Sequence, residues 1–208
     1  MKILITPGTG EIEVKKSKFI AHLRSVKTEE EALSFFAETK KKYWDAKHNC
    51  TAFVIGEDGR CARCSDDGEP AQTAGRPMLD VLMHSGVRNV ACVVTRYFGG
   101  VLLGTGGLVK AYSDAVSEAL KNSVIGEEIE GVSIPFTVDY TNYGKIQYLL
   151  ENLGYTIEDA AFEADVRAFV KVPLPEEESI RTKLTECTNG QIELGEGCQC
   201  SILTVPEE

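Results

Sequence analysis

The chain has 208 residues, 43% of them hydrophobic and 26% charged, a composition typical of a globular protein with one large domain or two small ones. No apolar run reaches membrane-spanning length, and the first residues lack the basic-then-apolar order of a signal peptide. We therefore expect a cytoplasmic protein with no membrane partner, whose seven cysteines are free thiols.

The net charge of −10 is divided unevenly along the chain. Residues 1–130 carry −1 and residues 131–208 carry −9. Because a nucleic-acid backbone is recognised by cations, the acidic second part is a poor candidate for contact with phosphate. Any nucleic-acid contact is expected in the first part, where basic residues gather locally.

The first part of the chain predicts the element order β-α-β-β-α-β-α. Residues 11–25 alternate loosely, as in a strand that turns or bulges. Thr28 begins a capping-box pattern before a helix that runs toward Trp44. The remaining elements are strands at 50–56, 61–65 and 87–98, a helix that carries Pro77 in its first turn and a helix at 105–122.

The second part predicts the order β-α-β-β-α-β, which is that of a ferredoxin-like split sandwich. A composition shift near residues 126–131 suggests a linker, so we expect domains at 1–128 and 129–208. Asn142 is the expected cap of the first helix. The predicted elements are strands at 132–140, 155–162, 164–172 and 192–205, and helices after Asn142 and from Pro175.

A glycine-rich segment follows the buried strand that ends at Arg96. The backbone N–H groups at a helix start are free and carry partial positive charge, so the glycines and the Arg96 side chain together suit an anion. Residues 73–77 repeat this logic, with Thr73 as a possible cap. The candidate residues for anion or nucleic-acid binding are Arg76, Arg96, Gly99, Gly100, Gly104, Gly106, Gly107 and Lys110.

Two further patterns carry possible chemistry. The loop 65–70 places three carboxylates in four positions, which suits a hard cation or a polar catalytic pocket, or else a loop whose carboxylates cap local N–H groups. An Asp45-x-x-His48 pattern could orient His48 as a general base. No nucleophile motif accompanies it. The catalytic candidates are His48, Asp66, Asp67 and Glu69.

Cys61 and Cys64 could form half of a zinc site with His48 and Cys50. Strand alternation, however, places Cys61 and Cys64 on opposite faces of a regular strand. We therefore assign no metal and no cofactor to the chain.

Four motifs in order resemble the signature of the YigZ/IMPACT family. They are Asp45-Ala46-x-His48-Asn49-Cys50, Ser65-Asp66-Asp67-Gly68-Glu69-Pro70, Thr73-Ala74-Gly75-x-Pro77, and residues 94–108 with the glycine pairs. The resemblance implies an α+β protein whose first domain is an α/β sandwich of the ribosomal-protein type, like domain IV of elongation factor G. It also implies a ferredoxin-like second domain.

The family's eukaryotic branch is associated with translational control through an extra N-terminal domain, which we do not expect in this chain. Ala71-Gln72 stands where many members have Ser-Gly. The resemblance supplies no set of catalytic residues.

Three hypotheses follow from these patterns. The first is a protein that associates with RNA or the ribosome in translation regulation, with Arg76, Arg96 and Lys110 contacting phosphate. The second is a hydrolase or other enzyme acting on a small phosphorylated or peptide-like substrate, which requires His48 to lie within reach of the acidic loop. The third is a structural role for the glycines, with function in a protein–protein surface. Burial of Arg96 against Asp66 or Asp67 would favour this third hypothesis.

Overall fold

The computed structural model describes residues 1–205 and divides into two compact units. Residues 1–127 with Val205 form the first unit, and Glu128–Thr204 form the second. Both units combine helices with β-sheet, as expected for an α+β protein. No helix in the described part of the chain is long and apolar enough to span a membrane.

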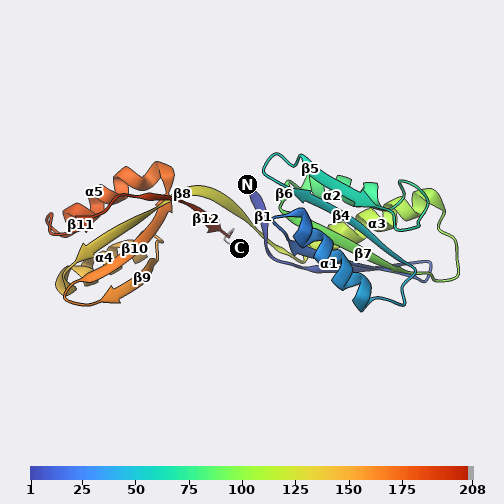
Figure 1. Cartoon of the computed structure of the whole chain (residues 1–208), viewed down its shortest axis with the longest axis horizontal. Helices are drawn as coiled ribbons and strands as arrows, with labels where there is room; N and C mark the ends of the chain where they lie inside the picture. Colours follow the sequence, from blue (N-terminus) through green and yellow to red (C-terminus); the bar gives the residue numbers. More distant parts are fainter. Residues whose placement is uncertain (206–208) are drawn as a thin grey trace. The chain divides into compact units, whose positions relative to one another are not determined.

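A five-stranded antiparallel sheet forms the centre of the first unit (Figure 1). One face of the sheet is covered by α1 (Glu29–Lys42), and the other by α2 (Gly75–Ser85) and α3 (Gly104–Lys121). Each face therefore has its own apolar core. The strands, in spatial order, are β2 (Thr9–Val14), β3 (Ser17–Ser25), β7 (Val90–Tyr97), β4 (His48–Ile55) and β5 (Cys61–Ser65).

The apolar run of β7 reflects its place at the centre of this sheet. Val90, Cys92 and Val94 pack in the core beneath α2 and α3, whereas Ala91 and Val93 pack beneath α1. Because both faces are covered, the strand does not alternate between apolar and polar residues. The expectation of a buried apolar strand before Arg96 is confirmed.

Of the two alternatives expected for the segment 11–25, a turn or a bulge, the structure has the turn, and the segment forms a hairpin. A two-residue turn, Lys15 and Lys16, joins β2 to β3, and both residues have left-handed backbone conformations, with φ of 48° and 66°. A turn of this kind matches the twist of the flanking strands but is usually made by Asn or Gly. The predicted strand 87–98 is likewise interrupted, because Asn89 at φ 54° separates β6 (Val87–Arg88) from β7.

The capping box predicted at Thr28 is present in part. The Thr28 hydroxyl accepts a hydrogen bond from the Glu31 N–H at 3.2 Å, but the Glu31 carboxylate accepts one from the N–H of Lys27, the residue before the cap, at 2.6 Å. The two bonds satisfy one backbone donor in the first turn and one just before the cap. They fix the point at which the chain leaves β3 and crosses the outer face of the sheet.

The segment 126–131 is not a linker. It lies within β8 (Val124–Val138), which is continuous through the boundary between the units and pairs with β1 (Lys2–Thr6) in its first residues and with β10 (Val166–Pro173) in its later ones. The glycines and glutamates at this boundary are therefore compatible with regular strand pairing. A composition shift alone does not distinguish such a strand from a linker.

The second unit packs two helices on one apolar sheet core. Asp139, not Asn142, caps the first helix, because the Asp139 carboxylate accepts a hydrogen bond from the Asn142 N–H at 2.8 Å. The predicted last strand is two short strands that both pair with β8. Beside β8 and β10, the elements are α4 (Tyr140–Asn152), β9 (Ile157–Phe162), η1 (Leu174–Glu176), α5 (Glu177–Cys187), β11 (Glu193–Leu194) and β12 (Cys198–Thr204).

The cap at Thr28 provides a test of this local structure. Replacing Thr28 by Ala removes the acceptor for the Glu31 N–H, and we expect the free energy of unfolding to fall by about 1 kcal/mol in urea titrations. Thr28→Ser keeps a hydroxyl and should stay close to the wild type. Equal stability of the Ala and Ser variants would show that the cap does not contribute.

Candidate functional site

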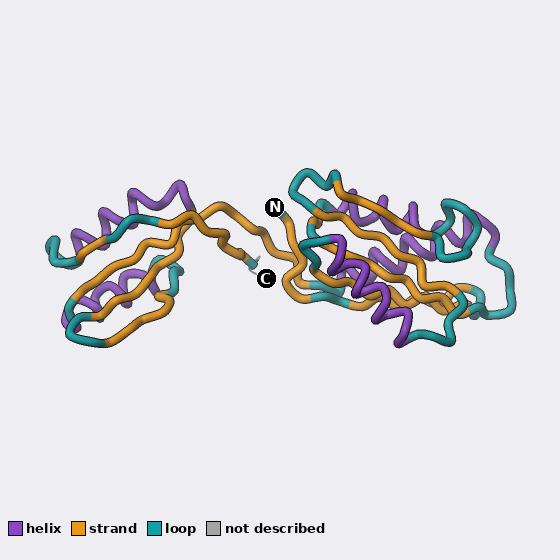
Figure 2. Tube along the Cα trace, viewed as in Figure 1, coloured by secondary structure: helices purple, strands orange, loops and turns teal. Residues whose placement is uncertain are grey.

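Four loops meet at one end of the sheet in the first unit. In an antiparallel sheet, alternate strands begin where their neighbours end, so the starts of β3 and β4 lie beside the ends of β5 and β7. The loops attached to these strand ends are seen together in Figure 2. They are the β2–β3 turn at 15–16, the α1–β4 loop at 43–47, the β5–α2 loop at 66–74 and the β7–α3 loop at 98–103.

Strand register brings two predicted site residues together at this end. His48 on β4 pairs directly with Arg96 on β7. Residues two apart on a strand lie on the same face, so His48 shares a face with Cys50 and Arg96 shares one with Val94. Both therefore face the core beneath α2 and α3. They lie 48 positions apart in the chain, and only the register shows that they are neighbours.

Arg96 is buried and forms an ion pair with Glu69. Arg96 is 6% exposed and Glu69 8%, and the Arg96 Nη1 donates to the Glu69 Oε1 at 2.6 Å. The Tyr112 hydroxyl on α3 donates to the same oxygen at 2.8 Å. The guanidinium carbon also lies 5.4 Å from the centroid of the Phe19 ring and 5.7 Å from that of Phe98.

This pairing changes the expected role of Arg96. The sequence suggests a full positive charge beside the helix start, but the Glu69 carboxylate neutralises that charge inside the protein. The internal pairing is the kind expected if the motifs had a structural role, although the partner is Glu69 and not Asp66 or Asp67. The Arg96 Nε has no hydrogen-bond partner within the described chain.

The Asp66 carboxylate occupies the start of α2. Its Oδ1 accepts hydrogen bonds from the N–H groups of Ala74 and Gly75 at 3.0 and 2.8 Å, and its Oδ2 accepts one from Gln72 at 2.8 Å. Burial alone would raise the pKa of Asp66, but these three donors hold the pKa below its usual value. The second predicted anion site, at residues 73–77, is thus filled by the protein's own carboxylate.

Thr73 does not cap α2, because its hydroxyl donates to the Pro70 carbonyl oxygen at 2.6 Å. Gln72 has a φ of 63° and stands where a glycine is common in the resembling family. Since only glycine adopts this conformation without strain, the departure at this position has a conformational cost.

Asp67 organises the neighbourhood of His48. Its Oδ2 accepts from the Asn49 N–H at 2.8 Å, and its Oδ1 forms an ion pair with Lys40 at 3.0 Å. His48 Nδ1 lies 2.9 Å from the Asp67 carbonyl oxygen, which only accepts, so Nδ1 carries the proton and Nε2 of the neutral ring is an acceptor. His48 therefore lies within reach of the acidic loop, as the enzyme hypothesis requires.

The three carboxylates of the acidic loop, Asp66, Asp67 and Glu69, thus all interact with other groups of the protein. Among residues 1–205, no group of three or more His, Cys, Asp or Glu side chains is arranged to hold a metal ion.

Cys61 pairs opposite Ile55 and Cys64 opposite Ala52, so the two thiols point to opposite faces as expected. Cys50 is fully buried beside the Tyr112 hydroxyl, and burial raises its pKa to about 12.

The start of α3, in contrast, carries no side-chain cap. Leu103 is the N-cap residue and makes no capping hydrogen bond, and Gly104, Thr105 and Gly106 are exposed. A Cβ placed at Gly104 or Gly106 would meet nothing within 4 Å. The first N–H groups of this long helix are therefore open, which is the arrangement that the glycine-rich sequence predicts.

A cavity of ≈ 470 Å³ lies at this helix start. The acidic loop and the β7–α3 loop form its walls, and His48 and Arg96 line it together with the first residues of α3. Most of the wall is apolar. Its lining residues are Lys47, His48, Gly68, Glu69, Pro70, Arg96, Phe98, Leu102, Leu103, Gly104, Thr105 and Leu108.

The remaining predicted glycines shape the loop that leads into the cavity. A Cβ at Gly99 would lie 2.0 Å from the Lys16 carbonyl carbon, so only glycine permits this close approach to the β2–β3 turn. Gly100 and Gly104 have left-handed φ values of 86° and 73°. A Cβ at Gly107 would lie 3.1 Å from the Leu103 Cβ, which is a tight approach. These four glycines therefore position backbone, and Gly106 is open to solvent.

Two of the basic residues predicted to bind an anion form ion pairs with acidic residues of their own helices. Arg76 forms an ion pair with Asp80 at 2.9 Å, and Lys110 forms one with Asp114 at 3.0 Å. Neither residue lines the cavity. The structure instead places four exposed lysines on the elements around this end that have neither an ion-pair partner nor a cation–π contact within residues 1–205. They are Lys15, Lys16, Lys41 and Lys47.

Two large exposed side chains complete this end. Trp44 in the α1–β4 loop and Leu102 in the β7–α3 loop are each 82% exposed. The sequence gives one indication that these side chains are exposed, because each is an apolar residue in a loop that joins predicted elements. Neither these two residues nor the four lysines were predicted as site residues, because exposed side chains scattered over several loops form no short motif.

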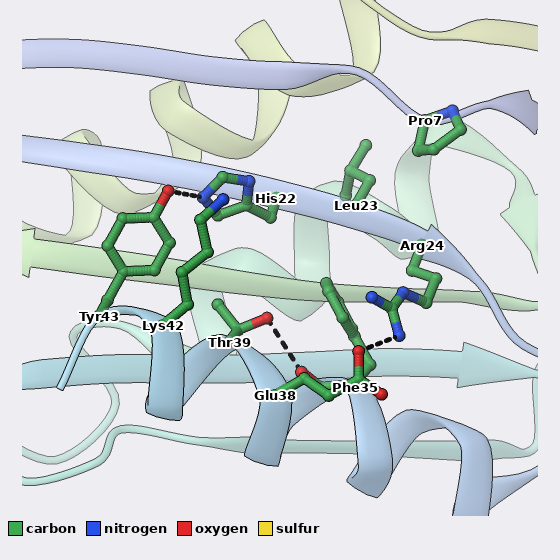
Figure 3. Close-up of a pocket in the computed structure, with 9 residues that line it drawn as sticks. All are labelled: Pro7, His22, Leu23, Arg24, Phe35, Glu38, Thr39, Lys42 and Tyr43. Carbon is green, nitrogen blue, oxygen red and sulfur yellow. Dashed lines mark hydrogen bonds and ion pairs between the residues drawn. The ribbon is translucent and has the colours of Figure 1, made fainter.

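A second cavity of ≈ 290 Å³ lies between α1 and β3 (Figure 3). His22 Nε2 lies 2.9 Å from the Tyr43 hydroxyl, and burial together with the nearby Lys42 lowers the pKa of His22. Arg24 in the same cavity is paired with Glu38 at 2.8 Å. This cavity has no open helix start, so the cavity at α3 is the stronger candidate site.

Comparison with known proteins agrees with this architecture. Residues 15–120 match the Impact N-terminal domain, and residues 136–191 match a domain of unknown function, DUF1949. The IMPACT family member YvyE of Bacillus subtilis is 40% identical over 91% of this chain and 88% of its own length. The IMPACT family member YigZ of Escherichia coli is 37% identical over 90% of this chain and 93% of its own.

A crystal structure described only as that of a hypothetical protein is also similar. It is 37% identical, covers 93% of this chain and 95% of its own, and superposes with a TM-score of 0.61. The chain is thus a two-domain protein that combines an Impact N-terminal domain with a DUF1949 domain. It belongs to the IMPACT family.

The Arg96–Glu69 pair makes a prediction about stability. Arg96→Met leaves the Glu69 carboxylate buried without its cation, so we expect the free energy of unfolding to fall by about 3–5 kcal/mol. The double variant Arg96→Met with Glu69→Gln should lose much less than the sum of the single variants in urea titrations.

The exposed pair of Arg76 and Asp80 is the matched control. Arg76→Met should change the free energy of unfolding by less than about 1 kcal/mol, because solvent screens this pair. Additive losses in the Arg96–Glu69 double variant would contradict the coupling inferred from the geometry.

Proposed function

We propose that the first unit binds RNA at the end of its sheet where the four loops meet, in a cytoplasmic role in translation regulation. One observation carries this proposal. Lysines without ion-pair partners and exposed aromatic side chains lie at the same end of the sheet as an uncapped helix start, in a strongly acidic protein. Cations bind the phosphate backbone, and aromatic rings stack with bases.

The charge at this end supports the proposal because Asp45 and the three acids of the 65–70 loop already have partners within the protein. Asp66 caps α2, Asp67 is paired with Lys40, and Glu69 is paired with Arg96. Asp45 accepts a hydrogen bond from the Tyr97 hydroxyl at 2.9 Å. The four lysines therefore present their charge to solvent, where it can attract phosphate.

The exposed rings favour single-stranded RNA. Trp44 is 82% exposed and Phe98 is 53% exposed, one on each of two loops at this end. Bases of a single strand are free to stack on such rings, whereas bases in a duplex are already stacked on each other. Because the resembling first-domain fold is of the ribosomal-protein type, the ribosome is the first RNA partner to test.

We also infer the fold family of each unit. The first unit is a ribosomal-protein-type sandwich, and the second has a ferredoxin-like fold. Support for the second comes from its sheet, in which β8 lies between β10 and the short strands β11 and β12, and β9 lies at the outer edge. This is the spatial order of a split β-α-β-β-α-β sandwich.

The RNA-binding proposal is tested by the salt dependence of affinity. We expect a single-stranded RNA oligonucleotide to bind more weakly at 200 mM salt than at 50 mM salt in fluorescence anisotropy. Lys15→Gln with Lys16→Gln should lower the affinity and reduce the slope of log K against log salt by about 0.7 for each phosphate that the variant no longer binds. Ribosome co-sedimentation under the same conditions tests the translation role.

Lys183→Gln in α5 of the second unit is the matched control, because Lys183 is also an exposed lysine. It should leave both affinity and slope unchanged. The absence of binding to RNA and ribosomes at 50 mM salt would reject the proposal, as would an equal effect of the control.

A second candidate function is an enzyme acting on a phosphate ester, favoured by the position of His48. The Asp67 carbonyl fixes the proton on Nδ1, so Nε2 of a cavity-lining His48 is available as a general base. If this function is correct, the protein should hydrolyse bis(p-nitrophenyl) phosphate, and His48→Gln should slow turnover by about 10²–10⁴-fold. No turnover by the wild type would reject it.

A further inference from the structure

We infer that the cavity at the start of α3 binds the phosphorylated terminal nucleotide of an RNA strand. This inference rests on the proposed RNA-binding function and specifies which part of the strand enters the protein. The lysines around the cavity would hold the following nucleotides by their backbone. The chemical class of the ligand is a nucleotide that carries a phosphate monoester.

The size of the cavity suits a small-molecule ligand. Its volume of ≈ 470 Å³ lies within the range of about 300–1,000 Å³ that is usual for such sites. Its walls come from three separate stretches of chain, namely residues 47–48, 68–70 and 96–108. Such a site admits the end of a chain more readily than a folded duplex.

The start of α3 provides the place for the phosphate. No side chain caps this helix, and glycines at 104 and 106 leave its N–H groups exposed. A terminal phosphate monoester carries about −1.5 to −2 at pH 7, whereas an internal diester carries a single charge, so the monoester gains more from the helix dipole. Lys47 lines the same cavity and adds a full positive charge.

Arg96 is a second and independent indication of a ligand. Its side chain lines the cavity although the residue is only 6% exposed, and only its Nη1 is engaged by Glu69. Its Nε has no hydrogen-bond partner in the described part of the chain. The Nε is sealed from solvent, so a ligand in this cavity would meet the guanidinium at Nη2, which donates no hydrogen bond within the described residues.

The apolar part of the wall provides the place for the base. Phe98, Leu102, Leu103 and Leu108 form this side of the cavity with Pro70. His48 Nε2 lines the same cavity and is an acceptor that can receive the exocyclic amino group of a base. The cavity therefore offers a base both apolar surface and a hydrogen-bond acceptor.

The test compares matched single-stranded RNA oligonucleotides that differ only at their ends. Fluorescence anisotropy would measure the affinity of the full-length protein for RNA with a 5′-phosphate, with a 3′-phosphate and with hydroxyl groups at both ends. We expect one phosphorylated form to bind at least about tenfold more tightly than the hydroxyl form. The dissociation constant of free adenosine monophosphate, measured by competition, distinguishes the two sources of the ligand: the end of an RNA strand should bind more tightly than the free nucleotide if RNA is the natural ligand.

Gly106→Asp is the variant that tests the site. It places a carboxylate at the open helix start, where nothing lies within 4 Å of the new Cβ and the helix dipole stabilises the charge. We expect it to abolish the preference for a phosphorylated end. Gly144→Asp in α4 of the second unit is the matched control, because Gly144 is also an exposed helical glycine with no atom within 4 Å of an added Cβ.

The outcomes separate this inference from the proposed function. RNA binding with equal affinity for all three ends would overturn the inference and leave the RNA-binding function intact. Loss of all RNA binding, with adenosine monophosphate still bound by the wild type and not by Gly106→Asp, would overturn the RNA function and assign the cavity to free nucleotides. If thermal melting shows that Gly106→Asp is unfolded, Thr105→Glu at the same helix start replaces it.

Discussion

Burying the carboxylate of Glu69 costs free energy, and the structure offsets that cost by bringing three segments to it. Arg96 comes from β7, Tyr112 from α3, and Glu69 itself from the loop between β5 and α2. Because an unpaired buried charge is strongly unfavourable, none of these segments can shift without the others. The acidic loop is thereby held in the position in which Asp66 meets α2 and Asp67 meets His48.

The same constraint explains how an acidic protein can present a basic surface. Each carboxylate of the loop has a partner inside the protein: Asp66 caps α2, Asp67 accepts from a backbone N–H, and Glu69 pairs with the buried Arg96. These three carboxylates do not pair with Lys15, Lys16, Lys41 or Lys47, and the start of α3 has no side-chain acceptor. Charge at this end is therefore set by which acids are engaged internally, and not by the net charge of the chain.

Much of this arrangement can be predicted from local sequence. The helix cap at Thr28, the hairpin between β4 and β5 and the open start of α3 follow from short-range patterns, and the structure contains all three. The Arg96–Glu69 pair cannot be predicted in this way, because strand register and loop path determine which charges meet. For the same reason local patterns do not indicate which lysines are free, and they do not distinguish a strand that continues from one unit into the other from a linker.

The turn between β2 and β3 shows where this protein departs from the most stable local choice. Lys15 and Lys16 both adopt left-handed backbone conformations, which cost about 1–2 kcal/mol for a residue with a side chain and almost nothing for glycine. An Asn-Gly pair would suit the same hairpin better. Selecting substitutions for thermal stability would therefore remove the charges of Lys15 and Lys16. In this protein, a position where glycine or asparagine would be more stable than lysine is also a position where a positive charge is present at a cost in stability.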